Sequence, residues 1–168
     1  MWDLEAALVD TKAGDFKLAT GLRPAGEPVH EMQLSVTIDT QLNVVGARAE
    51  SQRVPYPGHC ESVEPAYTKL VGLNLLRNFR ADVRERLGGT SGCSHLSELA
   101  TVLPTAAIQA FAGEVFKTRD TSQDGAGASK QPWQLDRCHA LRIDGPAVAE
   151  FYPRWYRGPA VSNPSDSQ

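Results

Sequence analysis

The sequence has little cysteine, and what it has does not suggest a disulfide framework. Its 168 residues include three cysteines, Cys60, Cys93 and Cys138. An odd number of cysteines, in a chain that we expect to be cytoplasmic, argues against paired disulfides. The three side chains are therefore interpreted as buried thiols, reactive thiols or metal ligands.

The sequence also lacks a strong excess of charge, a long apolar run and a nucleotide-binding fingerprint. Lys and Arg total 17 against 20 Asp and Glu, a net charge of -3, which argues against sequence-independent nucleic-acid binding. No apolar run approaches the roughly 20 residues that span a bilayer, and the first residues lack the basic and apolar regions of a signal peptide. No glycine-rich dinucleotide motif or P-loop appears, which argues against nicotinamide, flavin and nucleotide chemistry. We expect a cytoplasmic protein without membrane or nucleic-acid partners.

What is present is the composition of a globular domain. Hydrophobic residues make up 41% and charged residues 22% of the chain, too apolar for wholly disordered sequence. At roughly 150 residues per domain, the length predicts a single domain. We place it at 1–157, with a mobile loop over 119–132 and a disordered tail over 158–168.

The first third of the chain alternates apolar and polar residues, the period of half-buried strands. This pattern predicts strands over Trp2–Val9, Met32–Asp39 and Val44–Arg53, the last two joined by a hairpin connection. The segments around Gly14 and over Gly21–Pro28 read as loops.

From Ser62 onward the period changes to that of helices. We expect two short helices within Tyr67–Leu76, a helix over Phe79–Leu87 that Gly88 and Gly89 end, and a long helix over His95–Lys117 that Pro104 kinks or splits. A short strand or extended segment over Trp133–Ile143 and a short aromatic helix over Val148–Tyr156 follow. Strands followed by helices predict an α+β domain, with an antiparallel sheet of three to four strands covered on one face by helices.

Residues able to do chemistry gather where these elements begin and end. Imidazole and thiolate are the usual ligands of zinc and similar metals, so the clusters predict a zinc or iron site, although the spacing matches no established metal motif. The alternative is that the cysteines are small buried hydrophobes and the histidines make local hydrogen bonds. The candidate metal ligands are His30, Cys60, Cys93, His95 and Cys138.

The same residues permit acid–base catalysis. His95 is the candidate general base, with His30 and His139 as partners and Glu98, three residues further on, as an orienting carboxylate. An ordinary solvated helix pair is the alternative for Glu98. A thiol at a helix N-terminus faces the positive end of the helix dipole, so Cys93 is a candidate nucleophile or, alternatively, a packed side chain.

Two further groups suggest a ligand. Four arginines between Arg77 and Arg86 either attract a carboxylate or form a solvated helix face. Aromatic residues near the C-terminus either line a pocket for an aromatic ligand or cover the sheet. These aromatic residues are Trp133, Phe151, Tyr152, Trp155 and Tyr156.

Combined, several motifs resemble the bacterial domain of unknown function 2889 family. They are PAGEPVHEMQLSVTID, PYPGHC, LVGL, VRERLGGTSGCSHLSEL and LDRCHAL followed by DG, and together they extend the resemblance from Trp2 to about Tyr156. The sequence departs from the family at Glu31, where members often have Asp, and lacks the basic strand that often precedes the position of Trp2. The motif positions in this chain are His30, Glu31, Tyr56, Pro57, Cys60, Gly88, Gly89, Thr90, Gly92, Cys93, His95, Leu96, Glu98, Asp136, Cys138 and His139.

The family resemblance implies a small catabolic enzyme, because members are often encoded among genes for the breakdown of aromatic compounds. The order of elements is also similar to that of iron–sulfur cluster scaffold proteins. That second resemblance implies that His30, Cys60 and Cys93 meet at one end of the sheet.

Three functions are consistent with these observations. The first is an enzyme that acts on an aromatic or carboxylated metabolite by acid–base, lyase or hydrolytic chemistry. The second is a zinc or iron–sulfur carrier without turnover, and the third is a partner-binding module with structural Cys and His residues. A homodimer is the default assembly, because closed twofold oligomers are the commonest.

Overall fold

The computed structural model describes residues 1–115 and 131–158, which fall into two compact units, Met1–Ala110 and Phe111–Gln168. The sequence predicts one domain over 1–157, and the division into two units is finer than that prediction. Most of the predicted mobile loop and nearly all of the predicted tail lie outside the described residues.

The first unit is built on a three-stranded antiparallel sheet. Its strands are β1 (Trp2–Thr11), β4 (Pro28–Ile38) and β5 (Val44–Arg53), in the order β1-β4-β5. The three strands predicted from the alternating pattern are confirmed. However, β4 begins at Pro28 rather than at Met32, and this extension brings His30 into the sheet.

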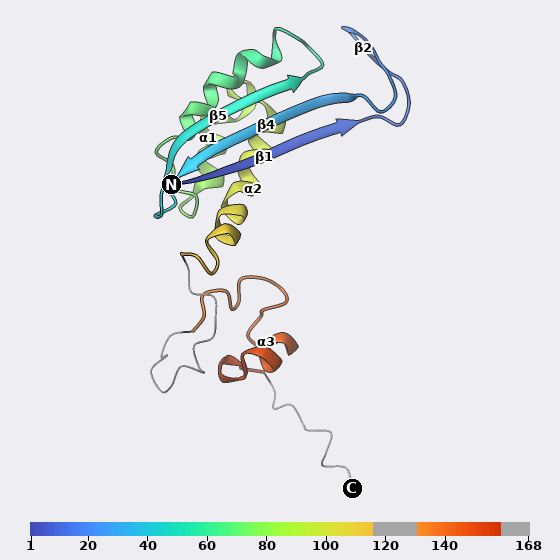
Figure 1. The fold of residues 1–168 in the computed structure, drawn as a ribbon. Coiled ribbons are helices and arrows are strands. Elements are labelled where there is room, and N and C mark those ends of the chain that lie inside the picture. The colour runs from blue at the N-terminus through green and yellow to red at the C-terminus, as the bar shows by residue number, and fades with distance from the viewer. Residues whose placement is uncertain (116–130, 159–168) are drawn as a thin grey trace. The chain divides into compact units, whose positions relative to one another are not determined.

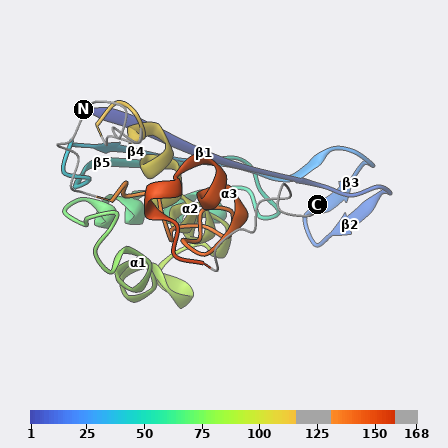
Figure 2. The ribbon, with the colours of Figure 1, turned by 90° about the horizontal axis from the view of Figure 1, so that it is seen from below.

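One face of this sheet carries the core. Along β4 the even-numbered side chains from Met32 to Ile38 are buried, and Leu4 of β1 lies opposite Val36 on the same face. Figure 1 shows α1 (Phe79–Leu87) and the first turns of α2 (Ser94–Phe111) behind the sheet, and Figure 2 shows α1 to one side of it. The predicted α+β class, an antiparallel sheet with helices, is confirmed.

Two of the predicted helices form close to where they were expected. In α1 a stripe of Phe79, Val83 and Leu87 is buried, as the four-residue spacing predicts. The helix α2 runs through Pro104 without being split and ends at Phe111 rather than Lys117.

In the region before α1, the prediction of two short helices is wrong. A 3₁₀ helix, η1 (Cys60–Leu70), is followed by an irregular segment instead of a second helix. Gly72 adopts a φ of 87°, and Asn74 forms an isolated β-bridge with Asn43. The chain therefore joins the end of the sheet here, and the apolar residues pack without helical periodicity.

The predicted loops between β1 and β4 contain a small second sheet. The strands β2 (Phe16–Leu18) and β3 (Gly21–Arg23) pair antiparallel. Figure 1 shows β2 beyond the end of β1. Three-residue strands leave too little alternation for the sequence to reveal.

In the second unit, the prediction of a short strand or extended segment over Trp133–Ile143 is wrong. These residues form turns, because Asp136 takes a left-handed φ of 59° and its carboxylate accepts the Ile143 N–H at 2.7 Å. The predicted aromatic helix forms as two short pieces, α3 (Pro146–Phe151) and η4 (Pro153–Trp155). Within the part of the chain that the structure describes, no helix has the length and apolar character needed to cross a membrane.

Candidate functional site

The apolar ladder between β1 and β4 ends in a polar pair. In the register of these strands Leu8 lies opposite Met32, and the next pair on the same face is Asp10 and His30. A β-bulge follows at once, since Thr11 pairs with Pro28 and Val29 is the extra residue. Bulges re-aim side chains and are common beside functional sites. This end of the sheet is where the candidate site lies.

The Asp10 carboxylate binds His30 twice. One oxygen, Oδ1, accepts the backbone N–H of His30 at 2.6 Å and lies 2.8 Å from its ring nitrogen Nδ1. Burial opposes ionisation of Asp10, but the side-chain and backbone hydrogen bonds from His30 outweigh it and lower the Asp10 pKa. A carboxylate only accepts hydrogen bonds, so Nδ1 of His30 carries the proton and Nε2 is the nitrogen that remains.

The ring of His95, from the first turn of α2, stacks on the ring of His30. The ring centroids are 4.1 Å apart and the planes are tilted by 34°. Burial lowers the His95 pKa from its ordinary value, electrostatic repulsion from the neighbouring His30 lowers it further, and Asp10 only partly compensates. His95 is therefore held in its neutral form at neutral pH, where its free nitrogen can accept a proton.

The last member of this group is Cys93, the residue just before α2. Its Sγ lies 3.8 Å from Nδ1 of His95, and its side chain is half-buried rather than enclosed. Its carbonyl accepts the N–H of Ser97, the first bond of the helix. The turn that leads to Cys93 needs glycine at position 92, because a Cβ there would collide with the carbonyl oxygen of Leu87.

Tyr67, which lies in η1, is hydrogen-bonded to the backbone of Cys93. The Tyr67 side chain is fully buried, and its hydroxyl accepts the Cys93 N–H at 3.0 Å. The same hydroxyl lies 2.9 Å from the Cys93 carbonyl oxygen and 3.0 Å from Oγ of Ser97. One phenol thus bonds both backbone groups of the cysteine.

The structure brings together three of the residues predicted for the site, His30, His95 and Cys93. Glu98 is exposed on α2, and within the described residues its side chain has no hydrogen bond to His95. The carboxylate that orients a histidine is instead Asp10.

The other predicted residues have the following surroundings. Cys60 is half-buried at the start of η1. Cys138 and His139 are exposed in the second unit, where Nε2 of His139 lies 3.3 Å from a guanidinium nitrogen of Arg142. Their roles stay predictions.

The described residues contain no group of ligands that corresponds to the predicted zinc or iron site. Across residues 1–115 and 131–158, no three or more His, Cys, Asp or Glu side chains are arranged to hold a metal ion. Nδ1 of His30 is hydrogen-bonded to Asp10, and the tilted rings of His30 and His95 contact one another.

Two residues of the site were missed by the sequence analysis. Asp10 follows Leu8 in the alternation of the first strand, so extending the predicted strand by one residue beyond Val9 would have placed Asp10 on the core face. Tyr67 carried no signal for a polar role, because within its segment it reads as one more apolar residue.

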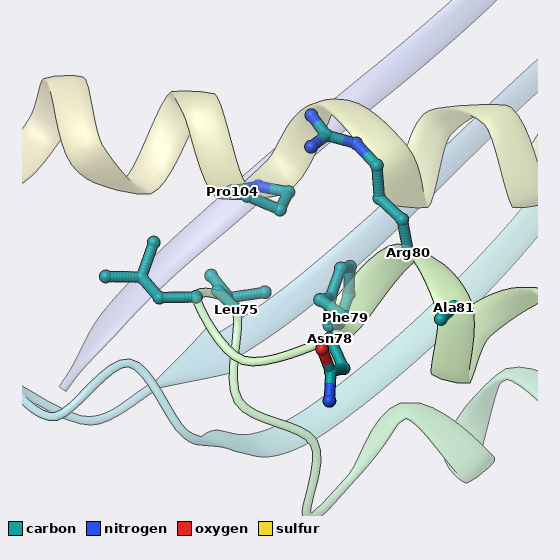
Figure 3. A pocket seen from close by; sticks show the side chains of 7 residues that line it. Leu75, Asn78, Phe79, Arg80, Ala81 and Pro104 are labelled. Carbon is teal, nitrogen blue, oxygen red and sulfur yellow. The ribbon is translucent and has the colours of Figure 1, made fainter. Parts of the chain in front are cut away.

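A separate pocket of about 190 Å³ lies between the start of α1 and the middle of α2. Figure 3 shows Leu75, Phe79 and Pro104 around it, with Arg80 at one side. Arg80, one of the four arginines considered for carboxylate binding, is exposed. The pocket contains none of the Cys or His candidates.

The fold and the site together define an α+β protein with a carboxylate, two stacked imidazoles and a thiol at one end of an antiparallel sheet. The family model described as protein of unknown function (DUF2889) matches residues 1–109. The chain belongs to this family, and the matched residues include Asp10, His30, Tyr67, Cys93 and His95. The motif residues Asp136, Cys138 and His139 lie beyond the match. No curated protein and no solved structure matches the chain, so the resemblance to iron–sulfur scaffold proteins is not shown.

Proposed function

We propose that the protein is a small enzyme that uses acid–base chemistry at Asp10, His30, His95 and Cys93. The observation that carries this proposal is the contact between two imidazoles in different surroundings. The ring of His30 is bonded to a carboxylate, and among the described residues the ring of His95 is not. Neighbouring titratable groups whose environments differ are typical of acid–base sites.

His95 is the general base of the proposed site. Its lowered pKa leaves the ring neutral at neutral pH, and Nδ1 lies within reach of the Cys93 thiol. In the first route the ring accepts the proton of this thiol, and the thiolate attacks the acyl carbon of an ester or thioester. The bond to the alcohol or thiol breaks, His95 returns the proton to that leaving group, and water then hydrolyses the acyl-enzyme to the free acid and the free thiol. In the second route the ring accepts a proton directly from the substrate. The first route is hydrolytic and the second is typical of lyases.

His30 is the second proton carrier, and Asp10 orients it. Because the carboxylate holds the proton on Nδ1, the Nε2 nitrogen of His30 exchanges protons with the reacting groups. An orienting carboxylate of this kind fixes both the tautomer and the ring plane, which acid–base catalysis requires.

The proposed substrate is an aromatic or carboxylated metabolite. This choice rests on the family resemblance and its association with the breakdown of aromatic compounds. Esters and thioesters of aromatic acids contain the electrophilic carbon that a thiol–imidazole pair would attack.

The proposal is tested with a panel of aromatic acids, their esters and their thioesters, followed by chromatography and mass spectrometry. We expect His95→Asn and His30→Asn each to reduce turnover by about 10²–10⁴-fold, the usual contribution of a general acid or base. His59→Asn is the matched control, because His59 is exposed in the same unit. Wild-type turnover in His95→Asn would contradict the proposal.

A further inference from the structure

The backbone of Cys93 is held more firmly than helix formation requires. A residue that caps a helix contributes only its carbonyl group to the hydrogen bonds of the helix. Here the Cys93 carbonyl already accepts the Ser97 N–H. Both the amide and the carbonyl of Cys93 also lie within hydrogen-bonding distance of the Tyr67 hydroxyl, at 3.0 and 2.9 Å. This second set of contacts calls for a separate explanation.

The geometry points to Tyr67 as the positioning residue that holds the Cys93 thiol against His95. This inference rests on the proposed function. The hydroxyl of Tyr67 accepts the Cys93 N–H and donates its one proton to the Cys93 carbonyl, and its second lone pair can accept the Ser97 hydroxyl. Because the amide and the carbonyl flank the Cα atom, bonding both restricts rotation about it and therefore limits where the thiol lies.

The position of Tyr67 suits this role. It lies in η1, a different element from Cys93, and its ring is fully buried. Leu70 follows it by one 3₁₀ turn, on the same side of η1, and is also fully buried. The hydroxyl is thus fixed by packing against the core, so it acts as a rigid anchor for the turn that begins α2.

Ser97 is a weaker second contact of the same anchor. Its Oγ lies 3.0 Å from the Tyr67 hydroxyl and 3.5 Å from the carbonyl oxygen of Leu87. Ser97→Ala leaves the bond from the Cys93 amide to Tyr67 in place. This variant separates the loss of a neighbouring hydrogen bond from the loss of the anchor itself.

The test measures the reactivity of Cys93 as the only thiol. In a Cys60→Ser, Cys138→Ser background, the rate of alkylation by iodoacetamide is followed across a pH range for four proteins. These are the parent and its Tyr67→Phe, Ser97→Ala and His95→Asn variants. Phenylalanine keeps the buried ring, and circular dichroism checks that each variant folds.

We expect Tyr67→Phe to lower the alkylation rate near pH 7 by about three- to tenfold and to move the pH profile toward that of His95→Asn. Such a fold-change corresponds to about 1 kcal/mol of lost orientation. Ser97→Ala should keep the profile of the parent. A purely structural tyrosine would lower the melting temperature without changing the profile.

The outcomes separate the two proposals. If His95→Asn changes the profile and Tyr67→Phe does not, the thiol–imidazole pair stands and the positioning role of Tyr67 is overturned. If His95→Asn leaves the profile of the parent unchanged, Cys93 and His95 are not coupled. That result overturns the thiol route of the proposed function and the positioning role with it.

Discussion

At the scale of single residues, the protonation states in the site depend on the burial and the hydrogen bonds of each side chain. His95 is a half-buried histidine stacked on a second one, and both features disfavour its charged form. Asp10 has the opposite balance, because two hydrogen bonds from His30 favour its carboxylate. Two groups at one end of the sheet are thus pushed toward the states that proton transfer needs.

The lowered pKa of His95 predicts a loss of stability in mild acid. Below the ordinary histidine value of 6.5 the unfolded chain takes up a proton at this position. The folded chain takes it up only at lower pH. The free energy of unfolding should therefore fall as pH drops from 6.5 through the folded pKa, and level off below it.

This effect is measured by urea denaturation at several pH values, together with an NMR titration of the His95 ring. His95→Gln should remove this part of the pH dependence, while His59→Gln should keep it because His59 is exposed. A His95 ring that titrates at or above 6.5 in the folded protein would contradict the assignment of the base.

At the scale of elements, the site exists because β1 and β4 continue as strands beyond the last apolar residues of their alternating pattern. The last apolar pair, Leu8 and Met32, is followed by Asp10 and His30 on the same face. The helix α2 packs its apolar stripe on the core and so brings its first turn over His30. The stripe consists of Leu96, Leu99, Ala100, Leu103 and Ala107.

The core face of β4 supports this arrangement, and Leu34 tests it. Its side chain is fully buried, so Leu34→Ala should reduce the free energy of unfolding by about 2–5 kcal/mol. Ser35 lies on the opposite face, and Ser35→Ala should stay within about 0.5 kcal/mol of the wild type. Equal effects of the two substitutions in urea denaturation would mean that the faces of β4 are assigned wrongly.

At the scale of the whole molecule, the family match and the first compact unit end almost together. The match ends at residue 109 and the unit at Ala110. All four groups of the proposed site fall within this span, together with Tyr67. The chemistry that we propose is therefore a property of the family region, and the second unit lies outside it.

Metal analysis of the whole chain tests the alternative of a zinc or iron carrier. The described residues form no group of three ligands. We therefore expect far less than one metal ion per chain in protein purified without a tag, a chelator or air. Near-stoichiometric zinc or iron, lost in a Cys93→Ala, His95→Ala variant, would contradict this expectation and favour the carrier.

The sequence by itself determined the α+β class, the three long strands and the helix α1, and it named His30, Cys93 and His95 as candidates, which the structure brings together. These features follow from local periodicity and from residue chemistry, which need no knowledge of distant contacts. It misplaced the short elements, such as the small sheet and the predicted strand at Trp133–Ile143, because a few residues show too little periodicity.

Only the tertiary structure decided which groups meet. The carboxylate that is hydrogen-bonded to a histidine is Asp10, twenty residues before His30, whereas Glu98, only three residues after His95, is exposed. Cross-strand register sets the first pairing, and the packing of η1 beside α2 brings Tyr67 to Cys93. Contacts of this kind depend on how separate elements pack, and no spacing along the chain contains that information.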